Sequence, residues 1–165
     1  MKKYLYFPFI ILSMFMTLTG CSSDKEDLPV PPPPVVIKGL TPLASASSWI
    51  TEAAAMQQKG YDPQVMVVYF SLENLPVAAS ANDLVGGFVG DQCRYAASVQ
   101  PFGNELIGCV VMYRVDADGS NPLSFNIRYY SKEEAGYFTA KPITFETNGT
   151  LGTLTEPARL TWITE

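Results

Sequence analysis

The stretch LSFNIRYY, residues 123–130, alternates between apolar and polar side chains. The apolar set is Leu123, Phe125, Ile127 and Tyr129, and the polar set is Ser124, Asn126 and Arg128. Successive side chains of a β-strand point to opposite faces, so the stretch predicts a strand with one buried and one outward face. It indicates a sheet that covers a core on one side.

Similar short stretches occur along the rest of the chain, with turn residues between them. Further strands are expected at 64–72, 84–89, 92–99, 105–115, 136–140, 143–147 and 158–163. Gly90-Asp91, with glycine first, is typical of a two-residue hairpin turn. About eight short strands predict an all-β domain over residues 40–165: an antiparallel β-sandwich, immunoglobulin-like or jelly-roll-like.

Three strands carry additional signals. Residues 64–72 are apolar on both faces, which predicts a buried strand. Residues 105–115 place an apolar set on one face: Ile107, Cys109, Val111, Tyr113 and Val115. In the last strand, Leu160 and Trp162 are expected to point inward.

A short helix is expected before the strands. SSWITEAAAMQQKG, residues 47–60, begins with serines, is rich in alanine and ends in glycine. Trp49, Ala53 and Met56 would share one face of this helix.

The first residues predict export. Lys2 and Lys3 precede a mostly apolar run, residues 4–18, which is shorter than the roughly 20 residues of a membrane-spanning helix. Residues 1–20 are therefore predicted to be a secretory signal peptide. Leu18-Thr19-Gly20-Cys21 resembles the lipobox of bacterial lipoproteins, which implies cleavage before Cys21 and acylation of that cysteine as a lipid anchor. The alternative is an ordinary signal peptide followed by a chance cysteine.

Residues 21–39 are predicted to be a tether. Ser22–Asp27 is acidic, and prolines dominate residues 29–34, which favours extended polyproline II. The acidic cluster resembles the export signal of Bacteroidota surface lipoproteins. This resemblance implies a lipid-anchored protein of the outer membrane, displayed on the cell surface.

The composition excludes several classes of function. Of 165 residues, 11 are basic and 16 acidic, and loss of Lys2 and Lys3 with the signal peptide would leave 9 basic residues and a net charge of −7. Nucleic-acid-binding proteins cluster lysine and arginine, so no nucleic-acid partner is expected. The chain has no histidine, which excludes Ser-His-Asp and Cys-His catalysis.

Two loops resemble ligand-binding motifs without matching them. Asp116–Asn121 spaces oxygen ligands as calcium loops do, but its glycine stands fourth rather than sixth, so a strand-joining turn is favoured. Residues 86–90, GGFVG, lack the order of a phosphate-binding loop and predict close backbone packing or a bulge. No catalytic residue, metal site or cofactor is expected, and the protein is predicted not to be an enzyme.

Cys93 and Cys109 form a candidate disulfide. If Val99 pairs with Gly103, Cys93 lies opposite Cys109, and both fall on the apolar faces of their strands. Export would permit the bond. The alternative is two buried thiols.

A candidate ligand or partner face comprises Arg94, Arg128, Tyr130 and Tyr137. These side chains are expected to point outward from neighbouring strands, where tyrosines could stack on sugar rings. The alternative is an ordinary solvated sheet face.

Several motifs resemble one family in their order. DLVGGFVGDQCR (residues 83–94), MVV (66–68), FNIRYY (125–130), ITF (143–145) and NGTLGTLTEP (148–157) resemble elements of small β domains in Bacteroidota surface lipoproteins. The resemblance implies partners, because such lipoproteins often accompany TonB-dependent transporters with SusD-like lids that import glycans or peptides. The expected function is a non-catalytic accessory subunit of such an uptake complex. The alternatives are an independent glycan- or peptide-binding module and an adhesin component.

Overall fold

The strand expected from LSFNIRYY is β7 (Ser124–Ser131), which lies inside the larger of two sheets. The computed structural model describes residues 35–58 and 64–164, and Val35–Glu165 form one compact unit. The predicted signal peptide, Cys21 and the tether as far as residue 34 lie outside the described residues.

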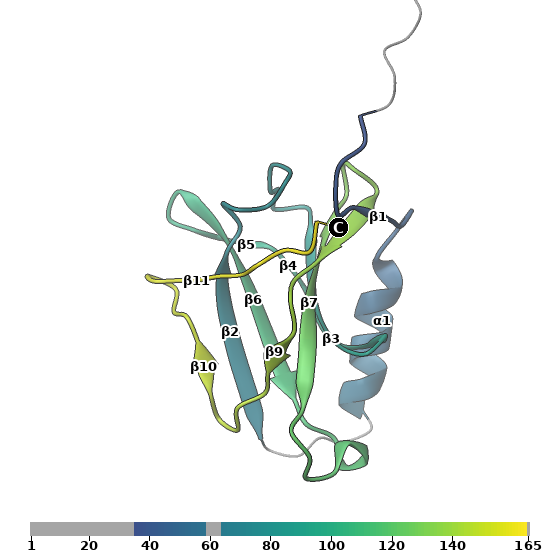
Figure 1. The fold of residues 1–165 in the computed structure, drawn as a ribbon, viewed down its shortest axis with the longest axis vertical. Helices are drawn as coiled ribbons and strands as arrows, with labels where there is room; N and C mark the ends of the chain where they lie inside the picture. Colours follow the sequence, from purple (N-terminus) through teal and green to yellow (C-terminus); the bar gives the residue numbers. More distant parts are fainter. Residues whose placement is uncertain (1–34, 59–63, 165) are drawn as a thin grey trace, which may run out of the picture. The chain divides into compact units, whose positions relative to one another are not determined.

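Within the described residues, the first sheet has six strands in the order β1-β8-β7-β3-β4, with β9 paired to β7 (Figure 1). Besides β7 its strands are β1 (Thr41–Pro42), β3 (Leu84–Val89), β4 (Gln92–Ser98), β8 (Gly136–Thr139) and β9 (Ile143–Thr144). All of its pairings are antiparallel. Gly90 has φ +59° in the predicted turn between β3 and β4, as such turns require.

The second sheet of the described chain has five strands in the order β10-β2-β6-β5, with β11 also paired to β2. They are β2 (Val65–Ser71), β5 (Gln100–Phe102), β6 (Glu105–Tyr113), β10 (Thr150–Leu151) and β11 (Ala158–Arg159). β2 and β6 are antiparallel, whereas β10 and β11 run parallel to β2. The all-β sandwich is confirmed, with two short parallel pairings that were not predicted.

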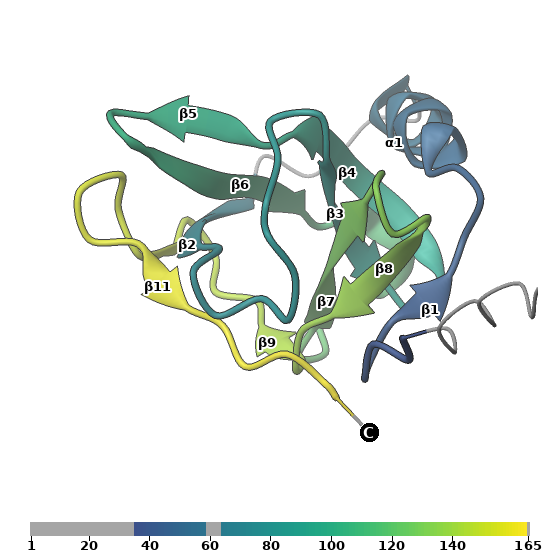
Figure 2. The ribbon, with the colours of Figure 1, turned by 90° about the horizontal axis from the view of Figure 1, so that it is seen from above.

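The core lies between the two sheets, whose arrangement Figure 2 shows from above. The apolar set of β7 and its flank is buried there as expected, and Leu160 and Trp162 join it. The glycines of β3 permit close packing: a Cβ at Gly87 would lie 2.2 Å from the sulfur of Met112. Gly87 therefore leaves room for the Met112 and Val110 side chains of the second sheet.

The helix α1 (Ser47–Gln58) covers the outer face of the first sheet, mainly over β4. Trp49, Ala53 and Met56 are its buried residues, as predicted. Trp49 and Ala53 pack with Phe88 and Cys93 into a second apolar cluster, outside the sandwich core. The first sheet is thus buried on both faces.

In β6 the predicted apolar set shares one face, but the residues that join the core are Val110 and Met112 of the opposite face. In β4 the outward direction predicted for Arg94 was wrong, because this side chain is buried. A β-bulge between Gly87 and Phe88 also disturbs the alternation of β4. Such a bulge inserts an extra residue and re-aims the side chains around it.

Candidate functional site

The predicted face of arginines and tyrosines is largely covered by α1. The Trp49 ring makes edge contacts with the rings of Tyr130 and Tyr137, at centroid distances of 6.1 and 5.8 Å. Tyr130 is buried, and its hydroxyl donates a hydrogen bond to the Ala44 carbonyl. Tyr137 is half-buried. The expectation that these tyrosines form an exposed platform was wrong, because the apolar side of α1 packs against both rings.

Arg128 is at the border of this covered face, and its charge is already engaged. Its guanidinium carbon lies 4.2 Å from the ring centroid of Phe88 and 5.3 Å from that of Tyr137. It also forms a 2.9 Å ion pair with the exposed Asp91. Cation–π contacts of this kind hold the guanidinium flat against the aromatic rings.

Arg94 is not on the surface but in a buried ion pair. Its two terminal nitrogens donate to the two carboxylate oxygens of Asp118 at 2.5 and 2.6 Å, and the side chains are 3% and 7% exposed. Asp118 also accepts from the backbone N–H of Val115. The hydrogen bonds from Arg94 lower the pKa of Asp118 below its ordinary value.

The same pairing explains the loop at Asp116–Asn121. Asp116–Asp118 forms a short 3-10 helix between β6 and β7, which agrees with the predicted strand-joining turn. The carboxylate of Asp118, a potential calcium ligand, is already bound by Arg94. In the described part of the chain no group of three or more acidic, cysteine or histidine side chains could hold a metal ion.

Cys93 and Cys109 are both free in the structure. They lie in different sheets: Cys93 is opposite Phe88 on β3, and Cys109 is opposite Tyr69 on β2. The predicted pairing of Val99 with Gly103 does not form, because Gln100–Phe102 pairs with Ile107–Glu105 instead. The structure therefore has the alternative of two thiols, one of them fully buried.

We expect the two thiols to differ in reactivity. Burial raises the pKa of Cys93 to about 12 and also raises the pKa of Cys109, which is only half-buried. Because the thiolate is the reactive form, iodoacetamide at neutral pH should modify Cys109 slowly and leave Cys93 unmodified until urea unfolds the domain. Peptide mass mapping measures both. A peptide pair that links the two cysteines without reductant would contradict the free thiols.

Asp83 has a structural part in the fold. Its buried carboxylate accepts hydrogen bonds from the Tyr129 hydroxyl and from the backbone N–H groups of Ser80 and Lys132. Burial, followed by the hydrogen bond to Asp83, raises the pKa of Tyr129. The network ties the loop between β2 and β3 to the end of β7, and it leaves little of the carboxylate free for a ligand.

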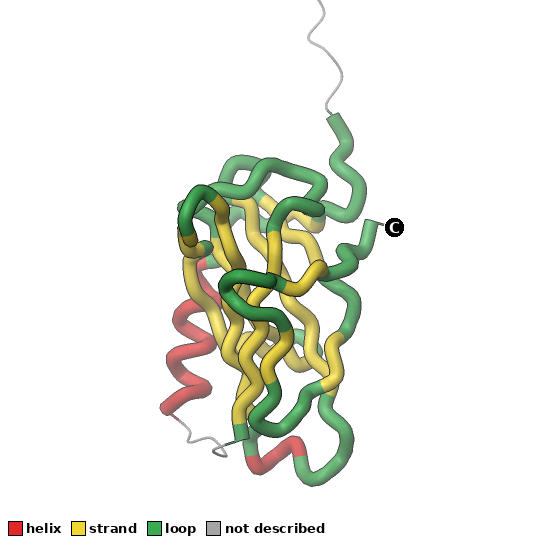
Figure 3. The backbone as a smooth tube through the Cα atoms, turned by 90° about the vertical axis from the view of Figure 1, so that its left-hand side faces the viewer, coloured by secondary structure: helices red, strands yellow, loops and turns green. Residues whose placement is uncertain are grey.

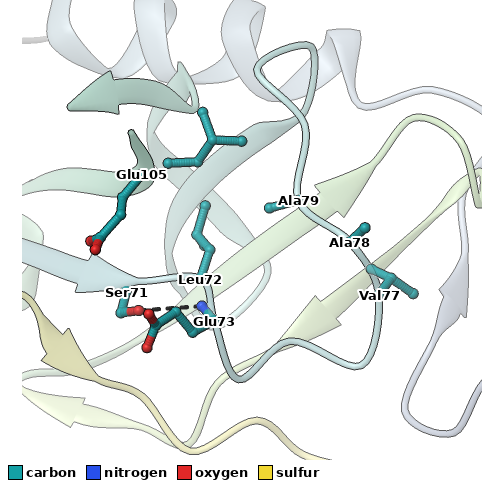
Figure 4. A pocket seen from close by; sticks show the side chains of 8 residues that line it. Ser71, Leu72, Glu73, Val77, Ala78, Ala79 and Glu105 are labelled. Carbon is teal, nitrogen blue, oxygen red and sulfur yellow. Dashed lines mark hydrogen bonds between the residues drawn. The ribbon is translucent and has the colours of Figure 1, made fainter. Parts of the chain in front are cut away.

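A cleft of about 290 Å³ lies between the end of β2 and the start of β6, and two glutamates, Glu73 and Glu105, are among the residues that line it. Figure 4 shows Glu73 and Glu105 beside this cleft, with Ser71 accepting a hydrogen bond from the Glu73 backbone. Both glutamates are exposed, and the Glu73 carboxylate lies 3.6 Å from Arg159.

The outer face of β2 and β6 carries mostly apolar side chains and no charged one. Its cross-strand pairs are Val65 with Tyr113, Val67 with Val111, Tyr69 with Cys109, and Ser71 with Ile107. Ser71 is the one residue among them that is neither apolar nor aromatic. Ile107, Tyr113 and Ser71 are buried, and the other five residues are half-buried. We name these eight residues the β2–β6 face. Figure 3 shows the backbone from the left-hand side of Figure 1, with α1 at the edge of the view.

A groove of about 310 Å³ adjoins this face. It is lined by Val65, Val111 and Tyr113 of the face, by Tyr95 of β4 and by Gln57 near the end of α1. The sequence contained a signal for this surface, since residues 64–72 are apolar on both sides and 105–115 has a second apolar set. The signal was interpreted as burial inside the domain.

No family model matches the chain, and neither the curated proteins nor the solved structures include a match. None of the helices in the described part of the chain has the length and apolar character that crossing a bilayer requires. The described residues form a β-sandwich with one sheet covered by α1 and a second sheet whose apolar outer face α1 does not cover.

Proposed function

We propose that this protein is a non-catalytic, lipid-anchored accessory subunit of an outer-membrane nutrient-uptake complex. It docks on its partner through the β2–β6 face. The observation that carries the proposal is the difference between the two sheets. α1 covers the apolar outer face of one sheet, whereas no helix among the described residues covers the apolar outer face of the other, where five of the eight residues stay half-buried.

The chemistry of the face indicates the kind of partner. None of its eight side chains carries a charge at neutral pH, and valines and tyrosines dominate it. The centres of protein interfaces are uncharged and rich in aromatic residues in this way. A sheet face that is exposed to water usually carries polar residues instead. The matching partner surface is an apolar patch on another protein.

The position of the face supports a neighbour in the same membrane. β2 and β6 run along the side of the sandwich, and the chain enters the domain at one end, at Val35 (Figure 1). With the tether and Cys21 holding that end, the β2–β6 face is presented sideways to adjacent membrane proteins. The resemblance to Bacteroidota surface lipoproteins supports a TonB-dependent transporter with its SusD-like lid as that neighbour.

The test is co-purification with matched lysine variants. The chain is tagged after Glu165, extracted from the outer membrane in mild detergent, and its partners are identified by mass spectrometry. Val67→Lys places a charge in the middle of the face and should reduce recovery of the transporter and lid at least about tenfold. Thr161→Lys, at an exposed position outside the face, should leave recovery unchanged. Equal recovery with both variants, at equal unfolding midpoints, would refute docking through this face.

A second candidate is a peptide- or glycan-binding module, which the groove favours. Tyr95 and Tyr113 border a recess large enough for part of a small ligand, and tyrosines commonly supply both stacking and hydrogen bonds in such sites. Peptide and glycan binding screens with a Tyr95→Ala control test this candidate. The adhesin alternative has less support, because two of the edge strands, β1 and β5, are short and contain Pro42 and Pro101, which hinder strand addition.

A further inference from the structure

We infer that the end of the domain at which the chain enters rests on the lipid headgroups, with the tip of the β5–β6 hairpin as its main contact. The inference rests on the proposed anchor at Cys21 and adds an orientation to it. We call this end the tether end.

Strand registers define the tether end. The chain enters through Val35 and reaches β1, which pairs with Tyr137 and Gly136 at the start of β8. The same end holds the finish of β2, the start of β6 and the start of α1 (Figure 1). Phe102 pairs with Glu105 at the first position of β6, so the β5–β6 hairpin turns at this end.

The exposed large apolar side chains gather in this half of the domain. In the described residues they are Val35 (88% exposed), Val36 (85%), Ile50 (50%), Leu154 (43%), Phe102 (42%) and Ile163 (38%). Ile50 lies in the first turn of α1, and the loop with Leu154 leads into β11, which pairs with the last residues of β2. Ile163 lies against Gly39, just after the chain enters.

The described residues at the opposite end are mostly polar. They include the loop at Asp116–Asn121 and the turn at Asn148-Gly149 (Figure 1). Asp116, Ser120 and Asn121 are exposed there. Apolar side chains at one end and acidic or amide side chains at the other are the pattern of a domain that faces a lipid interface on one side.

The hairpin tip is suited to shallow contact. All three residues of β5 are exposed, and Gly103 has φ +60° in the turn, so Phe102 is presented on a short, hydrogen-bonded hairpin. An aromatic ring is favoured at the boundary between headgroups and acyl chains. Glu105 and the glutamates Glu133 and Glu134 at the same end limit the contact to the headgroup region.

The length of the tether allows this contact. Thirteen residues lie between Cys21 and Val35, so the two residues can be at most about 50 Å apart when the tether is fully extended, and any shorter separation is permitted. The anchor keeps the domain near the bilayer, so a weak contact is sufficient to orient it.

The test places a tryptophan at each end of the full lipidated chain. F102W and S120W are reconstituted in phosphatidylcholine–phosphatidylethanolamine vesicles, with or without brominated acyl chains, which quench nearby indoles. The signal of the wild-type chain, from the buried Trp49 and Trp162, is subtracted. The inference expects at least twofold quenching of F102W and little or none of S120W, which places the same indole in the exposed loop between β6 and β7.

The other outcomes overturn the inference in distinguishable ways. If the chain floats with the vesicles but F102W is not quenched, the tether end is held off the lipid or belongs to a protein partner, and the proposed anchor is unaffected. Equal quenching at both positions shows that the domain has no preferred end. If the chain does not float with vesicles, the anchor fails and this inference fails with it.

Discussion

Replacing Arg94 by alanine should lower the free energy of unfolding by about 3–5 kcal/mol, because Asp118 would be left as a buried carboxylate without its cation. Four hydrogen bonds fix the guanidinium: two to Asp118, one to the Gln92 side chain and one to the Tyr113 carbonyl. The pair connects the bulge in β4 to the loop between β6 and β7. Urea unfolding followed by circular dichroism measures the loss.

The matched control is the double variant Arg94→Met/Asp118→Leu, which removes both charges together. A buried ion pair contributes little net stability when compared with apolar residues of similar size, so the double variant should recover more than half of the loss. If Arg94→Ala alone costs less than about 1 kcal/mol, which is the range of a surface pair, Arg94 is not buried with Asp118 as described.

The same pair predicts a dependence on pH. The pKa of Asp118 is lower in the folded chain, chiefly through its hydrogen bonds from Arg94. A carboxyl of this kind contributes stability above its unfolded pKa of about 3.9 and loses that contribution as the pH falls through its folded pKa. The wild-type chain should therefore lose stability in acid more steeply than the double variant. Equal slopes below pH about 4 would contradict the lowered pKa.

Arg94 also shows why alternation did not predict every side-chain direction. The alternating pattern of β7 predicted its side-chain directions correctly, because its pairings with β3 and β8 are regular. In β4 the bulge pairs Gly87 with Tyr95 and Phe88 with Cys93, so Arg94 has no partner on β3. A period of two assumes that no residue is inserted, and glycine-rich strands are where insertions are tolerated.

The β2–β6 face was missed for a different reason. The two apolar sides of residues 64–72 were recognised, but a sequence does not say whether the cover for a second apolar face lies within the same chain. The helix at 47–58 could have covered either sheet. The structure places it on the first sheet, where the rings of Phe88, Tyr130 and Tyr137 surround Trp49.

Trp49→Ala should cost about 3–5 kcal/mol of unfolding free energy, the range for removal of a large buried aromatic side chain. Trp49 is the centre of the cluster that joins α1 to the first sheet, with edge contacts to three aromatic rings. Without it, the remaining buried residues of the helix are Ala53 and Met56, which offer much less apolar area.

The neighbouring residue supplies the control for this prediction. Ile50 is half-exposed on the same helix, and Ile50→Ala should change stability by no more than about 0.5 kcal/mol. The two variants remove large side chains one position apart, so they separate the loss of packing from any change in helix propensity. If the helix is the cover that buries Tyr130, hydrogen exchange should accelerate in α1 and in β7 for Trp49→Ala alone. Similar exchange in both variants would mean that α1 is not held on the sheet by Trp49, and that the face of Arg128, Tyr130 and Tyr137 is accessible after all.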